Sequence, residues 1–164
     1  MHTLILDALE ATGARLPDKT AFIDEETSVT FSRLIALSRA VGSALSARVA
    51  PRTVVGFYMD KSCATVAGFL GAVYAGCAYA QLNLRHPAAR VRAILDTLAA
   101  PVVVTDRAHE AQLRAMDDLG ALILGAEKYQ KLLDHVTTAD GRQPPEAVDK
   151  ELGEILEAFN QGKN

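Results

Sequence analysis

The strongest constraint on the fold is a pair of short apolar runs rich in β-branched residues. Residues 53–59 read Thr-Val-Val-Gly-Phe-Tyr-Met, and residues 101–106 read Pro-Val-Val-Val-Thr-Asp. Such runs are typical of strands buried on both faces of a parallel sheet. Helical patterns separate them, and strands that alternate with helices predict right-handed crossovers. We therefore expect an α/β fold with a doubly wound, mostly parallel sheet flanked by helices.

The segment after the first run predicts a buried helix. Residues 64–75 are apolar on almost every side, which is the pattern of a helix covered all round. Asp60 or Ser62 can cap its start, because both side chains accept hydrogen bonds from the free N–H groups of a first turn. Gly76 follows as a natural C-terminal stop.

The rest of the α/β pattern continues to about residue 135. Residues 78–82 predict a strand of the same sheet, and Pro87 suits the first turn of the amphipathic helix that follows it. Residues 109–118 predict a weaker helix and residues 121–124 a short strand. A further helix is expected over 126–135.

Before the first run, the sequence predicts a helix and a hairpin. Apolar residues from Leu4 to Ala14 suit one helical face. Residues 21–24 and 28–31 flank a polar turn, which favours two paired strands. Apolar residues at helical spacing between positions 34 and 45 predict a second helix.

The chain divides into three predicted parts. Residues 1–136 are expected to form the α/β body, 137–147 a linker rich in Pro and Gly, and 148–164 a helical tail. The tail has an apolar stripe that needs a partner, so we expect it to fold back or to form a homodimer of the chain through residues 148–159. The stripe consists of Leu152, Ile155, Leu156 and Phe159.

Composition excludes several classes of function. The chain has 164 residues and a net charge of −3, with no cluster of Lys and Arg among aromatic residues, so no nucleic-acid partner is expected. The first residues lack a basic segment, and Asp7 and Glu10 interrupt their apolar run, so no signal peptide is predicted. No apolar run reaches membrane-spanning length. We expect a cytoplasmic protein with no membrane partner.

Few side chains suggest chemistry. Cys63 and Cys77 are expected to be small buried apolar residues, although Cys63 could be an activated thiol because it follows Ser62 at a helix start. The histidines lack the spacing of metal ligands or of a hydrolase triad and are expected to be surface or capping residues. They are His2, His86, His109 and His135.

Two acidic groups have open interpretations. Asp24, Glu25 and Glu26 could bind a cation, but adjacent carboxylates between strands are more often a solvated turn. Asp117 and Asp118 before a glycine favour the same interpretation.

Three segments in order resemble the N-terminal region of the adenylate-forming superfamily, which includes acyl-CoA synthetases, luciferases and the adenylation domains of nonribosomal peptide synthetases. Residues 29–34 resemble its entry into a long helix. Residues 71–79, with Pro87 and Arg90, resemble the pattern LKAGxAYxPLDPxxPxxR, and residues 101–106 resemble a strand ending in "vvvtd". The sequences of residues 59–62 and 68–71 are similar to those of amino-acid-activating members, including D-alanine:carrier-protein ligases.

The chain also departs from that pattern. Gln81, Leu82, Asn83 and Leu84 stand where the family usually has Pro-Leu-Asp-Pro, so the turn there is expected to differ. Backbone geometry alone explains Gly76 and Pro87 at element boundaries, and we assign neither a ligand role.

Adenylation requires a Gly/Ser/Thr-rich phosphate loop, an acidic residue for Mg²⁺ and a lysine, and the 164 residues contain no such loop. The resemblance therefore implies an N-terminal fragment without catalytic, cofactor-binding or metal-binding residues, itself inactive. Its parent enzyme would use ATP and Mg²⁺ to convert a carboxylate, possibly an amino acid, into an acyl-adenylate and pass it to a thiol of CoA or a carrier protein. The fragment's partner would be the remainder of that parent.

A second hypothesis is a free-standing doubly wound domain that binds a small molecule or a protein without catalysis. Its ligand would lie at the carboxyl ends of strands 53–59 and 78–82, where open α/β sheets bind ligands.

Overall fold

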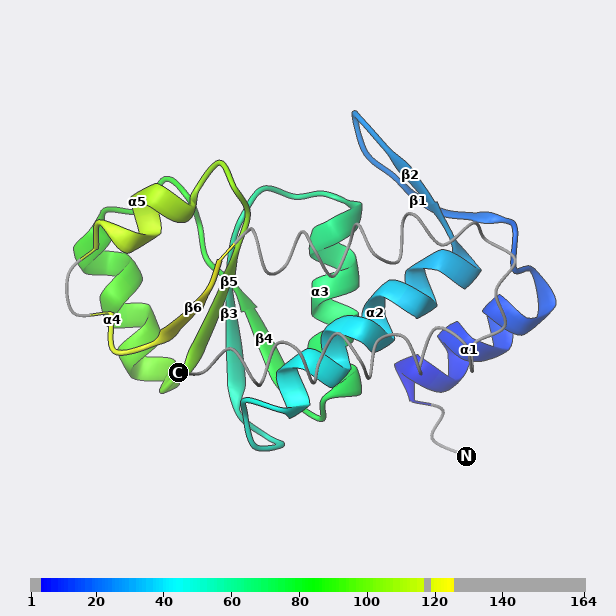
Figure 1. Cartoon of the computed structure of the whole chain (residues 1–164), viewed down its shortest axis with the longest axis horizontal. Helices are drawn as coiled ribbons and strands as arrows, with labels where there is room; N and C mark the ends of the chain where they lie inside the picture. The colour runs from blue at the N-terminus through cyan, green and yellow to red at the C-terminus, as the bar shows by residue number, and fades with distance from the viewer. Residues whose placement is uncertain (1–3, 117–118, 126–164) are drawn as a thin grey trace, which may run out of the picture.

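The structure is a computed structural model that describes residues 4–116 and 119–125. Its centre is a parallel sheet of four strands in the order β4-β3-β5-β6 (Figure 1). Strands β3 (Val54–Tyr58) and β5 (Val102–Thr105) pair in the middle, and β4 (Ala78–Gln81) and β6 (Leu122–Leu124) lie on either side. The predicted α/β class and the parallel central pair are confirmed.

Helices cover both faces of the sheet. Helices α2 (Phe31–Ser46) and α3 (Cys63–Tyr74) lie on one face, and α4 (Ala88–Leu98) and α5 (Glu110–Arg114) lie on the other (Figure 1). The strands alternate accordingly, because successive side chains of a strand point to opposite faces. The α2–α3 side receives Val55, Phe57, Val102 and Val104, and the α4–α5 side receives Tyr58 and Val103.

Helices α2 and α3 approach each other closely at two glycines. A Cβ atom added to Gly71 would lie 2.6 Å from Cβ of Val41, and one added to Gly42 would lie 2.7 Å from Cβ of Tyr74. Real Cβ atoms do not come this close, so the contact requires residues without side chains at both positions.

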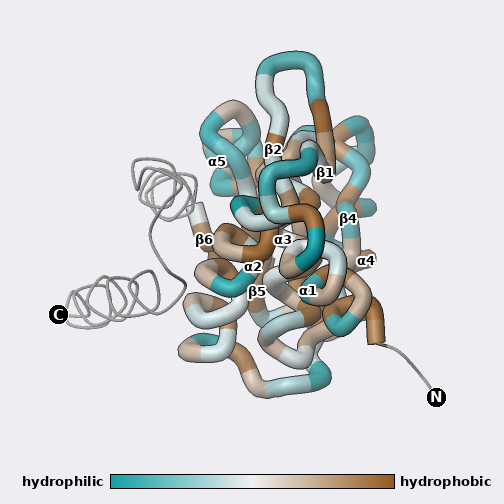
Figure 2. Tube along the Cα trace, turned by 90° about the vertical axis from the view of Figure 1, so that its right-hand side faces the viewer, coloured by the Kyte–Doolittle hydropathy of each residue, from teal (hydrophilic) through white to brown (hydrophobic). Residues whose placement is uncertain are grey.

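The N-terminal segment packs against this helix pair. Helix α1 (Ile5–Arg15) precedes the antiparallel hairpin of β1 (Thr20–Ile23) and β2 (Ser28–Thr30). The hydrophilic tip of the hairpin projects from the body in Figure 2. Less of this first helical segment is buried than its sequence predicts. Leu4, which is expected on the apolar face, is 68% exposed, and Gly13 is the buried residue of α1.

A polar triad joins the first three helices. Arg39 donates to the carboxylate of Glu10 at 2.9 Å, and the phenol of Tyr74 donates to the same carboxylate. Burial, reinforced by Glu10, raises the pKa of Tyr74 to about 12. The phenol therefore keeps its proton, which it donates to the shared carboxylate, throughout the physiological range.

The C-terminal predictions have different outcomes. Helix α5 is shorter than the predicted helix over 109–118, and β6 agrees with the predicted strand. The predicted helix over 126–135, the linker 137–147, the tail 148–164 and its dimer surface lie outside the described residues. Within the described part of the chain, no helix is long and apolar enough to cross a membrane.

Candidate site at the carboxyl edge of the sheet

An open hollow of about 1350 Å³ lies at the carboxyl ends of β3, β4 and β5. These strand ends form the upper edge of the sheet in Figure 1. Four segments line it: the hairpin turn 23–27, the start of α3 with the residues before it, the segment 81–85 and Asp106 after β5. Carboxyl ends of parallel strands share one edge of a sheet, which explains why polar residues distant in sequence meet here.

Asp24 ties the hairpin to the start of α3. Its carboxylate accepts from the backbone N–H of Cys63 at 2.7 Å and from those of Glu26 and Thr27 at 3.0 and 2.6 Å. The Cys63 N–H, followed by those of Thr27 and Glu26, lowers the pKa of Asp24 well below its usual range. Asp24 is thus an anionic cap on the α3 N-terminus, whereas Glu25 and Glu26 form the exposed turn that their sequence predicts.

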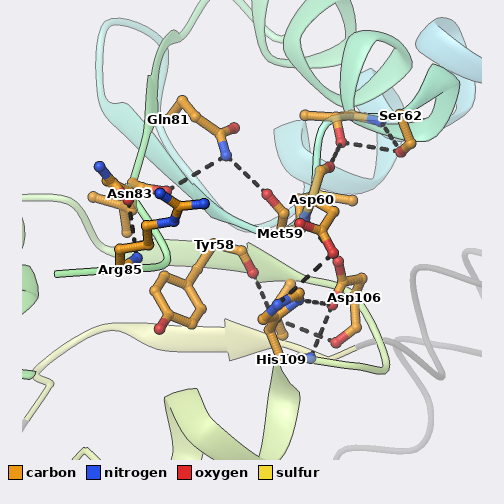
Figure 3. A network of polar contacts seen from close by, with 12 residues as sticks. Tyr58, Met59, Asp60, Ser62, Gln81, Asn83, Arg85, Asp106 and His109 are labelled. Carbon is orange, nitrogen blue, oxygen red and sulfur yellow. Dashed lines mark hydrogen bonds and ion pairs between the residues drawn. The ribbon is translucent and has the colours of Figure 1, made fainter. Parts of the chain in front are cut away.

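The segment that departs from the family pattern is held by two amides (Figure 3). Gln81 Nε2 donates to the carbonyl of Met59 at 2.9 Å and so joins the ends of β4 and β3. Asn83 Oδ1 accepts from the backbone N–H of Arg85 at 2.9 Å. An amide oxygen can accept such a bond as a carboxylate can, so the turn at Asn83 forms without an aspartate.

Asp60, Asp106 and His109 lie together where β3 and β5 end (Figure 3). One Asp106 oxygen lies 2.6 Å from His109 Nδ1, and the other accepts from the backbone N–H of Asp60 at 2.9 Å. The ring of His109 meets the buried ring of Tyr58 edge-on, with centroids 6.1 Å apart. His109 is therefore a part-buried and firmly oriented residue rather than a surface histidine. It stands at the N-cap position of α5, as the alternative of a capping histidine predicts, although its side chain makes no capping hydrogen bond.

Sequence reasoning missed this cluster, because 46 residues separate Asp60 from Asp106. The sequence does contain an indication of the cluster. Asp60 directly follows one apolar run that predicts a central strand, and Asp106 ends the other. If the two runs are neighbours in the sheet, the two aspartates must share its carboxyl edge.

The lining of the hollow carries excess negative charge. The α3 N-terminus, the natural place for a phosphate, already holds the carboxylate of Asp24. The lining contains five carboxylates against the cations Lys61 and Arg85. Such a negative lining repels phosphates, so no ATP-binding residue is assigned in the described ranges.

The cysteines are buried, as their sequence predicts. Burial raises the pKa of the Cys63 thiol, so the alternative interpretation of Cys63 as an activated nucleophile is wrong. Asp117, Asp118, His2 and His135 lie outside the described residues.

Residues 9–156 match the family described as AMP-binding enzyme. Nonribosomal peptide synthetase 32 of Fusarium pseudograminearum is 29% identical over 143 residues, which cover 87% of this chain and 2% of that protein. The chain thus spans a small part of this curated relative.

Solved structures agree. The AMPPNP-bound nonribosomal peptide synthetase FmoA3 matches with a TM-score of 0.69 and 27% identity over 84% of this chain and 14% of that chain. A benzoate CoA ligase from Burkholderia xenovorans matches with a TM-score of 0.70 and 25% identity over 77% of this chain and 27% of that chain. The four-stranded parallel sheet and its helices match the N-terminal subdomain of adenylate-forming enzymes. The chain belongs to the family of AMP-binding enzymes.

Proposed function

We propose that this chain supplies the first α/β body of an enzyme that activates an amino acid as its adenylate and passes it to a thiol. The family match over residues 9–156 carries the proposal. The relative FmoA3, 28% identical, has been solved with α-methyl-L-serine-AMP bound, which is an amino-acid adenylate. The matches to nonribosomal peptide synthetases favour an amino acid as the substrate and a carrier protein as the thiol acceptor.

Within such an enzyme, this body serves as a scaffold. Its hollow is lined by carboxylates, and Asp24 occupies the α3 N-terminus, so ATP and Mg²⁺ would be held by other parts of the parent. The remainder of the parent is accordingly the first partner of this chain. We propose that the 164-residue chain alone is inactive, because its sequence contains no phosphate loop.

Two measurements test this proposal. The purified chain should show no amino-acid-dependent exchange of pyrophosphate into ATP. A chimera of FmoA3 that carries residues 9–125 of this chain in place of the matching segment should form adenylate with the amino-acid preference of FmoA3. Exchange by the chain alone, or a folded chimera with a new preference, would contradict the scaffold role.

The hollow itself favours a second candidate, a binding domain without catalysis. It lies where open α/β sheets bind ligands, and its lining is rich in carboxylates. A small cation is therefore the class of ligand to test, with spermidine as the probe. Stabilisation by spermidine that disappears in Glu26→Gln would support this candidate, and an unchanged melting temperature would exclude it for polyamines.

A further inference from the structure

The hydrogen bond from the Asp60 N–H to Asp106 links the ends of β3 and β5, but the proposed scaffold gives no role to the side chain of Asp60 or to the imidazole of His109. One ligand atom from each of Asp60, Asp106 and His109 lies within 4.8 Å of the other two. We propose that this cluster binds a divalent transition-metal ion of the Zn²⁺ class, with His109 Nε2 and a carboxylate oxygen of Asp60 as ligands. Asp106 is the positioning residue that orients the imidazole.

The hydrogen bond between His109 and Asp106 leaves His109 Nε2 available to bind a metal ion. Nδ1 lies 2.6 Å from Asp106 Oδ1, so in the neutral ring it donates its proton to that carboxylate. Nε2 then carries the free lone pair and faces Asp60. A carboxylate behind a metal-bound imidazole is the usual way in which proteins fix its tautomer and raise its basicity.

The separation of the two ligands suits an ion between them. His109 Nε2 lies 3.8 Å from Asp60 Oδ2, which is too long for a hydrogen bond. Two bonds of about 2.0–2.1 Å to one Zn²⁺ ion span at most about 4.1 Å. The Asp60 side chain is 73% exposed and can rotate inward to close the angle, and water can complete the coordination.

The surroundings support a cation, and the imidazole determines its class. Glu25 and Glu26 line the same hollow as Asp60 and add negative charge. An imidazole favours Zn²⁺, Cu²⁺ or Ni²⁺, whereas Mg²⁺ prefers oxygen ligands alone. The imidazole also distinguishes this cluster from an exposed group of acids. The proposed ion is therefore separate from the Mg²⁺ expected for the parent.

Titration calorimetry of the 164-residue chain with Zn²⁺ tests the site. We expect a binding event that weakens at least ~10-fold in Asp60→Asn and in His109→Gln, because each removes one of two protein ligands. His86→Gln is the matched control, since His86 lies outside the cluster, and it should leave this binding event unchanged. Circular dichroism of each variant checks that the fold persists.

Asp106→Asn tests the positioning role, because it removes the negative charge but leaves one acceptor oxygen. That oxygen can keep one of the two backbone hydrogen bonds that Asp106 accepts, from His109 or from Asp60. Zn²⁺ affinity should fall by about 10–100-fold. In wild-type protein, the ¹⁵N signal of His109 Nε2 should shift on metal addition, a response that a merely structural histidine would not give. Binding weaker than about 1 mM, or affinity unchanged in both Asp60→Asn and His109→Gln, would overturn the proposal. Either result leaves the scaffold proposal intact.

Discussion

The α2–α3 contact and the carboxyl edge of the sheet are held together in opposite ways. At Gly71 and Val41 the helices meet with no room for one extra carbon atom. At the carboxyl edge, separate hydrogen bonds link the segments around an open hollow. The backbone N–H of Cys63 donates to Asp24, and that of Asp60 donates to Asp106.

The two regions should therefore respond differently to change. A close-packed interior transmits any change of volume to its neighbours, whereas an edge held by separate hydrogen bonds can open locally at a lower free energy than global unfolding. Substitutions in the interior should lower the stability of the whole domain. Substitutions at the edge should act mainly on the segment that they tie.

The largest effect is expected from Phe57→Ala. Phe57 is fully buried in β3, and its ring meets that of Phe69 edge-on with centroids 5.1 Å apart. Removing the ring leaves a cavity and should lower the free energy of unfolding by about 3–5 kcal/mol. Urea denaturation monitored by circular dichroism measures this loss.

Phe22→Ala is the matched control, since Phe22 is 44% exposed in the hairpin. It should cost about 1 kcal/mol or less. Equal losses at the two positions would show that the interior is no more sensitive than the hairpin.

The next effect is expected from Gly71→Ala. The added carbon would lie 2.6 Å from both Cβ and Cγ1 of Val41 and 3.0 Å from the carbonyl oxygen of Ser38, none of which is the free end of a flexible side chain. Overpacking should cost about 1–3 kcal/mol, offset in part by the better helix propensity of alanine, about 1 kcal/mol. The urea midpoint should fall.

Gly13→Ala in α1 serves as the control. Its added carbon meets mainly Cδ1 of Ile35, the far end of a side chain that can move aside. This variant should be neutral or slightly stabilising. A greater loss at Gly13 than at Gly71 would contradict the close contact of α2 with α3.

The smallest effect on the whole domain is expected from Asp24→Asn, which weakens the link between the hairpin and the start of α3. The pKa of Asp24 is lowered in the folded state, chiefly by the Cys63 N–H. The carboxylate therefore stabilises the fold fully above its unfolded pKa of about 3.9. This contribution is lost as the pH falls toward the lowered folded pKa, because the unfolded state then binds more protons.

Asp24→Asn should accordingly be less stable than wild type at pH 7, and the difference should shrink as the pH falls below about 4. Hydrogen exchange should report faster opening of the hairpin and of the first turn of α3. Glu25→Gln, a change in the same turn at an exposed residue, should alter neither. A difference that grows on acidification would show that Asp24 is not the anionic cap.

The sequence predicts the interior of this protein better than its carboxyl edge. Strands β3 and β5 are recognisable because burial on both faces demands continuous apolar residues. The hydrogen bond from the Cys63 N–H to Asp24 crosses 39 residues and exists only once the hairpin and α3 are placed together. The sequence places three strands in one sheet but does not give the order β4-β3-β5-β6. Site contacts depend on that order.

The central position of β3 has a consequence for vectorial synthesis on the ribosome. Both of its neighbours, β4 and β5, are translated after it, so the strand cannot find its partners as it emerges. At roughly 5–20 residues per second, β5 is completed roughly 2–9 s after β3. At the start of that interval Val55 and Phe57 can pack only against earlier side chains such as those of α2, because those of α3 and β5 are not yet made. Tyr58 lacks its whole cluster, since every other member follows it in the sequence. The nascent chain thus presents an apolar strand to chaperones before it can form its sheet.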